Sequence, residues 1–100
     1  MNISTHTDYG TCTFAVQGRI DTLTAPELEQ AITENAPECD KMVFDLKDVD
    51  YISSAGLRVI LLAHREMKQK GGLTLKGLNP NIRAIMMMTG FHKVLQIEES

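Results

Sequence analysis

The segment Asp50-Tyr51-Ile52-Ser53-Ser54-Ala55-Gly56-Leu57 decides how the fold is interpreted. It follows the apolar run at residues 42–46 and precedes a helix-patterned stretch at residues 57–69. A strand therefore delivers two adjacent serines to the start of a helix. Such a start presents free backbone N–H groups and the positive end of the helix dipole, so a phosphate on either hydroxyl would find donors in place. The serines have no catalytic partners in this segment and are interpreted as sites of modification rather than nucleophiles.

Length and composition fit one globular domain spanning residues 1–100. Hydrophobic residues make up 43% and charged residues 23% of the chain, which is ordinary for such a domain. Ten basic and 13 acidic residues give a net charge of −3. This balance, without a cluster of Lys or Arg, argues against a nucleic-acid partner and favours a protein partner.

The sequence shows neither a membrane span nor a signal peptide, so a cytoplasmic location is expected. Cys12 and Cys39 have no spacing typical of a metal or redox site. Cys12 alternates with Phe14 and Val16 in an expected strand, which predicts a buried free thiol. His6, His64 and His92 also lack metal-ligand spacing, so neither a metal nor another cofactor is expected.

Hydrophobic periodicity and turn residues predict an α/β fold in the order β-β-α-β-α-β-α, a mixed sheet with helices packed on it. The expected elements are strands at residues 2–6 and 11–17, a helix from 24 to before 37, a strand at 42–46, a helix at 57–69, a strand at 73–78 and a helix at 80–89. Residues 91–97 are compatible with one further short strand.

The first helix has the residues of a defined start. Thr24 and Glu27 fit a capping box, and Leu23 and Leu28 stand at the positions of a hydrophobic staple. In the last helix Met86 is expected in the core, whereas Met87 could lie on either side.

The chain resembles the STAS domains, named for sulfate transporters and anti-sigma-factor antagonists. Residues 50–57 look like the signature of that family, and three further segments match in order. They are Gln17-Gly18-Arg19-Ile20-Asp21, Gly71-Gly72-Leu73-Thr74-Leu75 and Met88-Thr89-Gly90-Phe91-His92-Lys93-Val94-Leu95. The resemblance covers nearly the whole chain and implies a single STAS domain of the architecture above. Many members carry a further C-terminal helix, whereas this sequence ends with Glu98-Glu99-Ser100.

The resemblance implies an anti-sigma factor antagonist. Such a protein binds an anti-sigma factor that is also a serine kinase, is switched off when Ser54 is phosphorylated, and is reset by a separate phosphatase. The family usually has Asp where this chain has Ser53, which adds a second candidate for phosphorylation. The residues expected to contact the partner are Gly18, Ile20, Asp21, Thr22, Ser53, Ser54, Ala55, Gly56 and Arg58.

Several alternatives stay open. The serines could serve only as helix caps, and Asp21 could be an ordinary turn residue. Gly56 has two compatible roles, and we expect both: it relaxes the tight turn from strand to helix and keeps a docking surface flat. A second function implied by the resemblance is that of an accessory subunit docking on a lipid-transporting ABC transporter. An enzyme is not expected, because His64 lies ten residues beyond Ser54 on one helix, about 15 Å away. The sequence leaves the oligomeric state open.

Overall fold

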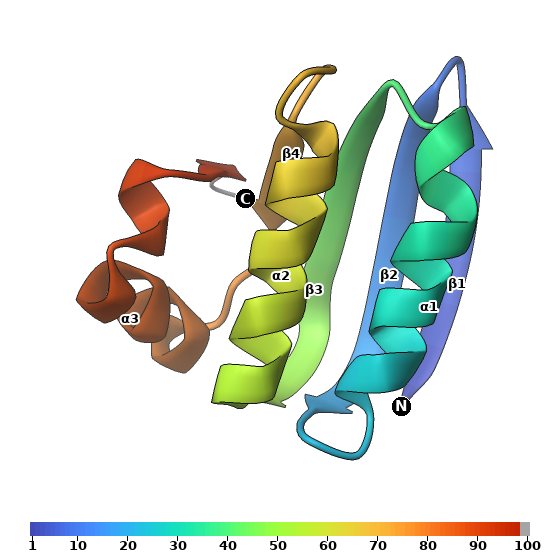
Figure 1. The fold of residues 1–100 in the computed structure, drawn as a ribbon. Coiled ribbons are helices and arrows are strands. Elements are labelled where there is room, and N and C mark those ends of the chain that lie inside the picture. Colours follow the sequence, from blue (N-terminus) through green and yellow to red (C-terminus); the bar gives the residue numbers. More distant parts are fainter. Residues whose placement is uncertain (99–100) are drawn as a thin grey trace.

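The computed structural model describes residues 1–98 and shows a five-stranded sheet with helices packed against it (Figure 1). The end of the chain at residues 99 and 100, where the family pattern continues into another helix, lies outside the described residues. The elements in chain order are β1 (Asn2–Asp8), β2 (Thr11–Ile20), α1 (Ala25–Asn35), η1 (Ala36–Glu38), β3 (Lys41–Ile52), α2 (Ser54–Met67), β4 (Leu73–Lys76), α3 (Pro80–Thr89), η2 (Phe91–Lys93) and β5 (Gln96–Glu98).

The strands lie in the sheet in the same order as in the chain. β1 and β2 form an antiparallel hairpin, and β3, β4 and β5 each join in parallel. Helices α1 and α2 lie side by side over one face, and α3 lies beyond α2, past β4 (Figure 1). The predicted fold class and element order are therefore confirmed, and the short last strand exists as β5.

The core lies between the sheet and the two long helices. Alternate residues of β2 turn toward α1 and α2, as the period of a strand requires, and Phe14 and Phe44 are fully buried there. Their rings meet edge to face with centroids 5.5 Å apart. Met86 of α3 is also fully buried, as predicted, whereas Met87 is 58% exposed. No helix within residues 1–98 is long and apolar enough to cross a membrane.

Three strands are longer than predicted: β1 continues past His6 to Asp8, and β2 and β3 also extend further. β2 continues past Gly18 to Ile20, and β3 continues past Leu46 to Ile52. The pairing of these strands shifts register between Ala15 and Gln17 and again at Gly18, where φ is +101°. Such irregularities let a ladder continue through a segment that would otherwise end it. Gly18 was therefore wrongly interpreted as the end of the strand.

The start of α1 differs from the prediction. Thr24 is the N-cap residue, but its side chain accepts no hydrogen bond from the helix, so the capping box is absent. Its hydroxyl is bonded into the preceding loop instead. Leu23 is 88% exposed, so it cannot form the predicted hydrophobic staple with the buried Leu28.

The two cysteines correct a further prediction. Both are fully buried, but Cys12 is joined to Cys39 in a disulfide and is not a free thiol. The pairing follows from the parallel register. Cys12 lies opposite Met42 of β3, and Cys39 lies shortly before Met42 in the chain. Their Cα atoms are 5.7 Å apart, which suits a disulfide. The separation of 27 residues conceals this proximity in the sequence.

Candidate functional site

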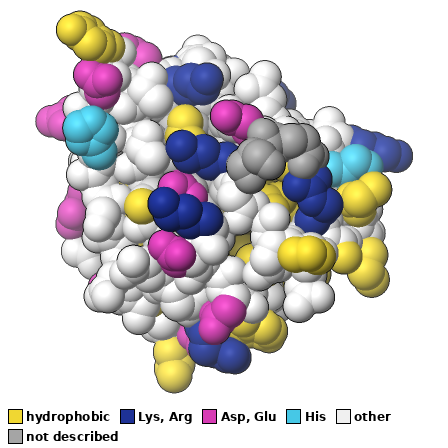
Figure 2. All heavy atoms as spheres, turned by 180° about the vertical axis from the view of Figure 1, so that it is seen from behind, with side chains coloured by type: hydrophobic (Ala, Val, Ile, Leu, Met, Phe, Trp, Pro, Cys, Tyr) yellow, Lys and Arg dark blue, Asp and Glu magenta, His cyan; other side chains and the backbone are white. Residues whose placement is uncertain are grey.

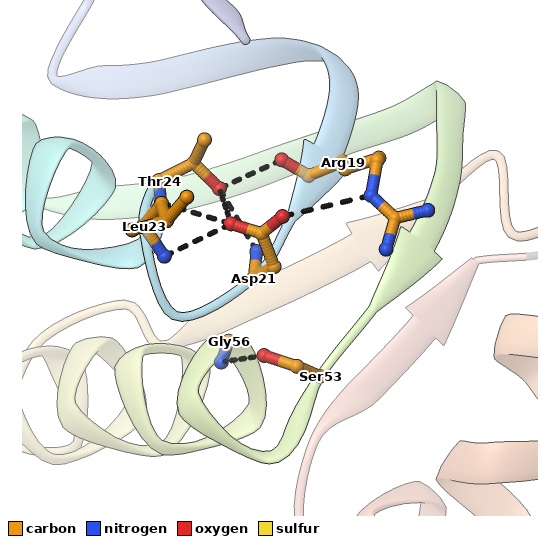
Figure 3. A network of polar contacts seen from close by, with 6 residues as sticks. All are labelled: Arg19, Asp21, Leu23, Thr24, Ser53 and Gly56. Carbon is orange, nitrogen blue, oxygen red and sulfur yellow. Dashed lines mark hydrogen bonds and ion pairs between the residues drawn. The ribbon is translucent and has the colours of Figure 1, made fainter.

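The loops predicted to act together lie together at one end of the sheet. β2 and β3 are parallel, so the loops that follow them start from the same end of the sheet. The backbone N–H of Ser53 donates to the carbonyl oxygen of Ile20 at 2.8 Å, which joins the loop before α2 directly to the loop before α1. Figure 3 shows the two polar networks facing one another across this junction.

The serines take the places that their chemistry predicts. Ser53 has extended backbone and is the N-cap of α2, and its Oγ accepts from the N–H of Gly56 at 3.4 Å. Ser54 is the first residue of α2 and is exposed. Its hydroxyl therefore stands at the positive end of the helix dipole, where an added phosphate would be favoured by the nearby N–H groups.

Gly56 lies in the interior rather than on a docking surface. A Cβ built at this position would come within 2.7 Å of side-chain carbons of both Ile20 and Ile52. Glycine is needed here because the start of α2 packs directly on the ends of β2 and β3. Ile20 is itself fully buried. The Ile20 side chain therefore cannot contact a partner directly. Gly56 and Ile20 instead hold the two loops together.

Asp21 organises the loop between β2 and α1. Its Oδ1 accepts from the N–H groups of Leu23 and Thr24, each at 3.0 Å, while its own N–H donates to Thr24 Oγ1 at 2.8 Å. Thr24 Oγ1 in turn donates to the carbonyl oxygen of Arg19 at 2.8 Å (Figure 3). The N–H of Thr24 is the main cause that lowers the pKa of the Asp21 carboxyl. Asp21 is thus both a turn residue and a fixed negative charge beside the serine loop.

The remaining predicted residues surround this junction. Thr22 and Arg58 are exposed, Ala55 is half-buried, and Gly18 takes a positive φ that favours glycine. Gly18 lies near the end of β2, Thr22 and Asp21 lie in the loop that follows it, and Ser54, Ala55 and Arg58 lie at the start of α2. We call this set, together with Ser53, the switch surface.

Sequence reasoning missed three side chains at the border of the switch surface. The Arg19 guanidinium carbon lies 4.3 Å from the centroid of the Tyr51 ring, and Arg19 Nε lies 3.5 Å from Asp21 Oδ2. Tyr51 is 42% exposed, and Leu23 rises from the loop that Asp21 holds. Arg19 and Tyr51 lie directly opposite one another in the register of β2 and β3. The sequence would have indicated this contact only if both strands had been predicted to extend as far as these residues.

Within the part of the chain that the structure describes, no group of three or more His, Cys, Asp or Glu residues could hold a metal ion. The hydrogen bonds of Ser53 serve the helix start and the strand ends. The geometry defines a small α/β domain with an exposed serine hydroxyl beside the loops at one end of its sheet.

Comparison with known proteins gives this class a family. The STAS domain model matches residues 2–100, and the chain belongs to the STAS domain family. It is 34% identical to BtrV of Bordetella bronchiseptica over 87 residues, which is 85% of this chain and 75% of that protein. It is 30% identical to the anti-sigma-B factor antagonist of Bacillus subtilis over 83 residues, or 82% of this chain and 76% of that protein.

A solved structure has the same fold. The anti-sigma factor antagonist from Mycobacterium paratuberculosis superposes with a TM-score of 0.88 at 27% identity, covering 96% of this chain and 83% of that one. The likeness extends over the whole sheet and its helices, so the predicted family membership is confirmed.

Proposed function

We propose that this protein is an anti-sigma factor antagonist controlled by phosphorylation of Ser54. The observation that carries the proposal is the exposed Ser54 at the first position of α2, beside the Asp21 loop, in a chain similar to the Bacillus subtilis anti-sigma-B factor antagonist. The partner is an anti-sigma factor with serine kinase activity. Binding of that partner at the switch surface frees the sigma factor that it would otherwise hold.

Phosphorylation opposes this docking through charge and bulk. A phosphate carries a charge of about −1.5 to −2 at neutral pH. The Asp21 carboxylate is held negative in the adjoining loop, because its hydrogen bonds lower its pKa. Modification of Ser54 therefore adds charge of the same sign and extra volume to a surface that the unmodified protein presents to its partner. A separate phosphatase restores the unmodified state, and the protein itself, acting in the cytoplasm, catalyses no step.

Phosphorylation and binding can be tested with one set of variants. The anti-sigma factor is captured from cells of the source organism with the Ser54→Ala protein as bait, purified, and incubated with ATP and the wild-type protein. We expect phosphate at Ser54, localised by tandem mass spectrometry. Titration calorimetry should show that Ser54→Ala binds within about twofold of wild type, while Ser54→Asp binds about tenfold or more weakly, a loss of about 1.4 kcal/mol.

Ser53→Ala is the matched control, because it removes the neighbouring hydroxyl and its cap hydrogen bond but keeps the proposed acceptor. It should still be phosphorylated, with a loss of about 1 kcal/mol in stability from the missing cap. Equal affinity of the Ser54→Ala and Ser54→Asp proteins would contradict the switch. Phosphate on Ser53 alone would move the acceptor by one residue.

A further inference from the structure

The outer edge of β1 is an open strand edge. β1 pairs with β2 and is the terminal strand of the sheet formed by the described residues, and six of its seven residues are exposed. Its pairing runs without interruption from Asn2 opposite Gln17 to Asp8 opposite Thr11. Proteins commonly protect such an edge with Lys, Pro or a bulge. β1 has none of these, so its outward N–H and C=O groups are available to an added strand.

A groove accompanies this edge. It has a volume of about 300 Å³ and lies between β1 and the outer flank of α1. Ile3 and Ala31 contribute apolar surface, and Glu27 and Glu34 contribute carboxylates. The other lining residues are Thr5, Gln30 and Asn35. A strand added beside β1 would direct alternate side chains into this groove, since those of Ile3 and Thr5 already point there.

The charges of the chain are unevenly divided, and the groove lies in the acidic part. Residues 1–40 contain Arg19 as their only cation, whereas the other nine of the ten Lys and Arg residues follow. The same forty residues contain seven carboxylates: Asp8, Asp21, Glu27, Glu29, Glu34, Glu38 and Asp40. In Figure 2 the edge that β1 forms lies at the left and shows acidic side chains, while Lys and Arg lie over the middle and the opposite side.

We propose that the β1 edge and its groove bind an extended segment of a partner protein in which lysine or arginine alternates with other residues. The segment would pair with the backbone of β1. Its cations would lay their aliphatic stems over Ile3 and Ala31 and reach Glu27 and Glu34. These carboxylates are seven residues apart on α1, about 10 Å along the helix axis. Side chains on one face of a strand recur about every 6.6 Å, so flexible cations two or four residues apart reach both.

The charge pattern favours this occupant over a second copy of the chain. Two β1 edges paired about a twofold axis would bring two α1 flanks together, and each flank carries Glu27 and Glu34 without a basic residue on α1. Like charges across such an interface oppose association. The inference concerns a different edge of the molecule from the switch surface and does not depend on the proposed function.

The test uses peptides of defined sequence and the folded full chain. The probe is acetyl-Thr-Lys-Val-Lys-Val-Lys-Thr-amide, and the matched control peptide has Glu in place of Lys. Nuclear magnetic resonance titration should show saturable shifts in the amides of residues 2–8 and 27–35 with the basic peptide and none with the acidic one. The affinity should fall with added salt, because the contacts at the rim are solvent-exposed.

Variants separate the site from general charge attraction. The double variant Glu27→Gln/Glu34→Gln should lower the affinity for the basic peptide by about tenfold. The control Glu29→Gln/Glu38→Gln removes the same charge from exposed positions outside the groove lining and should leave the affinity within about twofold. A third peptide, N-methylated at every residue, has no N–H donor on either strand edge and no room for close pairing, so it should not bind.

The outcomes that would overturn the proposal are distinct. Equal weakening by both double variants would show unspecific attraction, and equal binding of the N-methylated peptide would exclude strand pairing. Shifts centred on the switch surface, or no saturation at about 1 mM peptide, would also overturn it. Concentration-dependent shifts at residues 2–8 in the absence of peptide would replace the partner segment with a second copy of the chain.

Discussion

Gly56 shows how a single missing side chain positions the switch surface. Its Cα lies so close to Ile20 and Ile52 that the first turn of α2 rests directly on the two strand ends. This packing, together with the backbone hydrogen bond from Ser53 to Ile20, sets the distance between the serine loop and the Asp21 loop. The glycine is thus required by the interior, while its effect is on the surface.

We expect Gly56→Ala to lower the free energy of unfolding by about 1–3 kcal/mol, because the new methyl group overpacks two buried isoleucines. Urea unfolding followed by circular dichroism measures this loss. Ser54→Ala adds no atoms at the neighbouring exposed position and should change stability by about 0.5 kcal/mol or less. A folded Gly56→Ala protein of wild-type stability would show that the helix start can shift at no cost.

Asp21 should make the loop sensitive to acid. Because its pKa is lowered in the folded protein, the carboxylate contributes stability that is complete above its ordinary pKa of 3.8 and is lost as the pH falls through the folded-state pKa. Asp21→Asn should therefore be less stable than wild type near neutral pH. This difference in stability should shrink as the pH falls below the ordinary pKa of the Asp21 carboxyl. Thermal unfolding from about pH 3 to about pH 7 tests the trend. A difference that is independent of pH would contradict it.

Individual residues divide into those that sequence rules describe and those that packing decides. Ser53 and Asn79 follow local capping rules, since the side chain of each accepts a hydrogen bond from the backbone N–H three residues further along. Leu23 and Gly56 could not be placed, because their environments depend on the contact between two loops that are about thirty residues apart in the chain. Local periodicity assigns Leu23 to a staple, but the hydroxyl of Thr24 is used by the loop and the leucine remains outside.

At the level of elements, a residue that caps a helix can also attach that helix to a strand. Asn79 Oδ1 accepts from the N–H of Ile82 at 2.8 Å, and Asn79 Nδ2 donates to the carbonyl oxygen of Val49 at 3.0 Å. One side chain thus begins α3 and fixes that beginning to β3. This contact therefore sets where the helix starts.

Asn79→Ala should destabilise the protein by about 1–2 kcal/mol through loss of the cap and of the bond to Val49. Asn81→Ala is the control, since Asn81 is an exposed residue two positions further along and should change stability by about 0.5 kcal/mol or less. Denaturant unfolding compares the two. If both variants lose the same stability, the loss is not specific to the anchor at Asn79.

Element order could be predicted more fully than element ends. Turn residues such as Gly10, Gly72 and Gly90 separate the elements clearly, and all three take positive φ. The ends of β2 and β3 were missed because two irregularities in their pairing allow both strands to continue beyond the apolar runs. A single strand contains no sign of its partner's register, so these irregularities, and the Arg19–Tyr51 contact that depends on them, required the structure.

At the scale of the whole molecule, the disulfide closes the N-terminal part of the fold. Cys12 lies near the start of β2 and Cys39 lies shortly before the start of β3, so the bridge encloses most of β2 and all of α1. The family resemblance predicted the architecture but not this bridge, because a pairing over 27 residues has no local pattern. The bond restricts the unfolded chain more than it reshapes the folded one.

Reduction should lower the free energy of unfolding by about 3–4 kcal/mol, the value expected for closing a loop of this length. Guanidinium unfolding with and without dithiothreitol measures the difference. Cys39→Ala lacks the bridge under both conditions and should show no dependence on the reductant. Identical unfolding of the wild-type protein in both conditions would mean that the cysteines are not paired in solution.

The match between strand order in the sheet and strand order in the chain has a consequence for synthesis on the ribosome. Each strand that leaves the exit tunnel finds the growing border of the sheet already formed by its predecessor, and no strand has to insert between two earlier ones. The hairpin of β1 and β2 can form first. β3, β4 and β5 can then add to it one after another, after the helices that precede each of them in the chain. Assembly can therefore keep pace with translation, from the N-terminus onward, without undoing any earlier pairing.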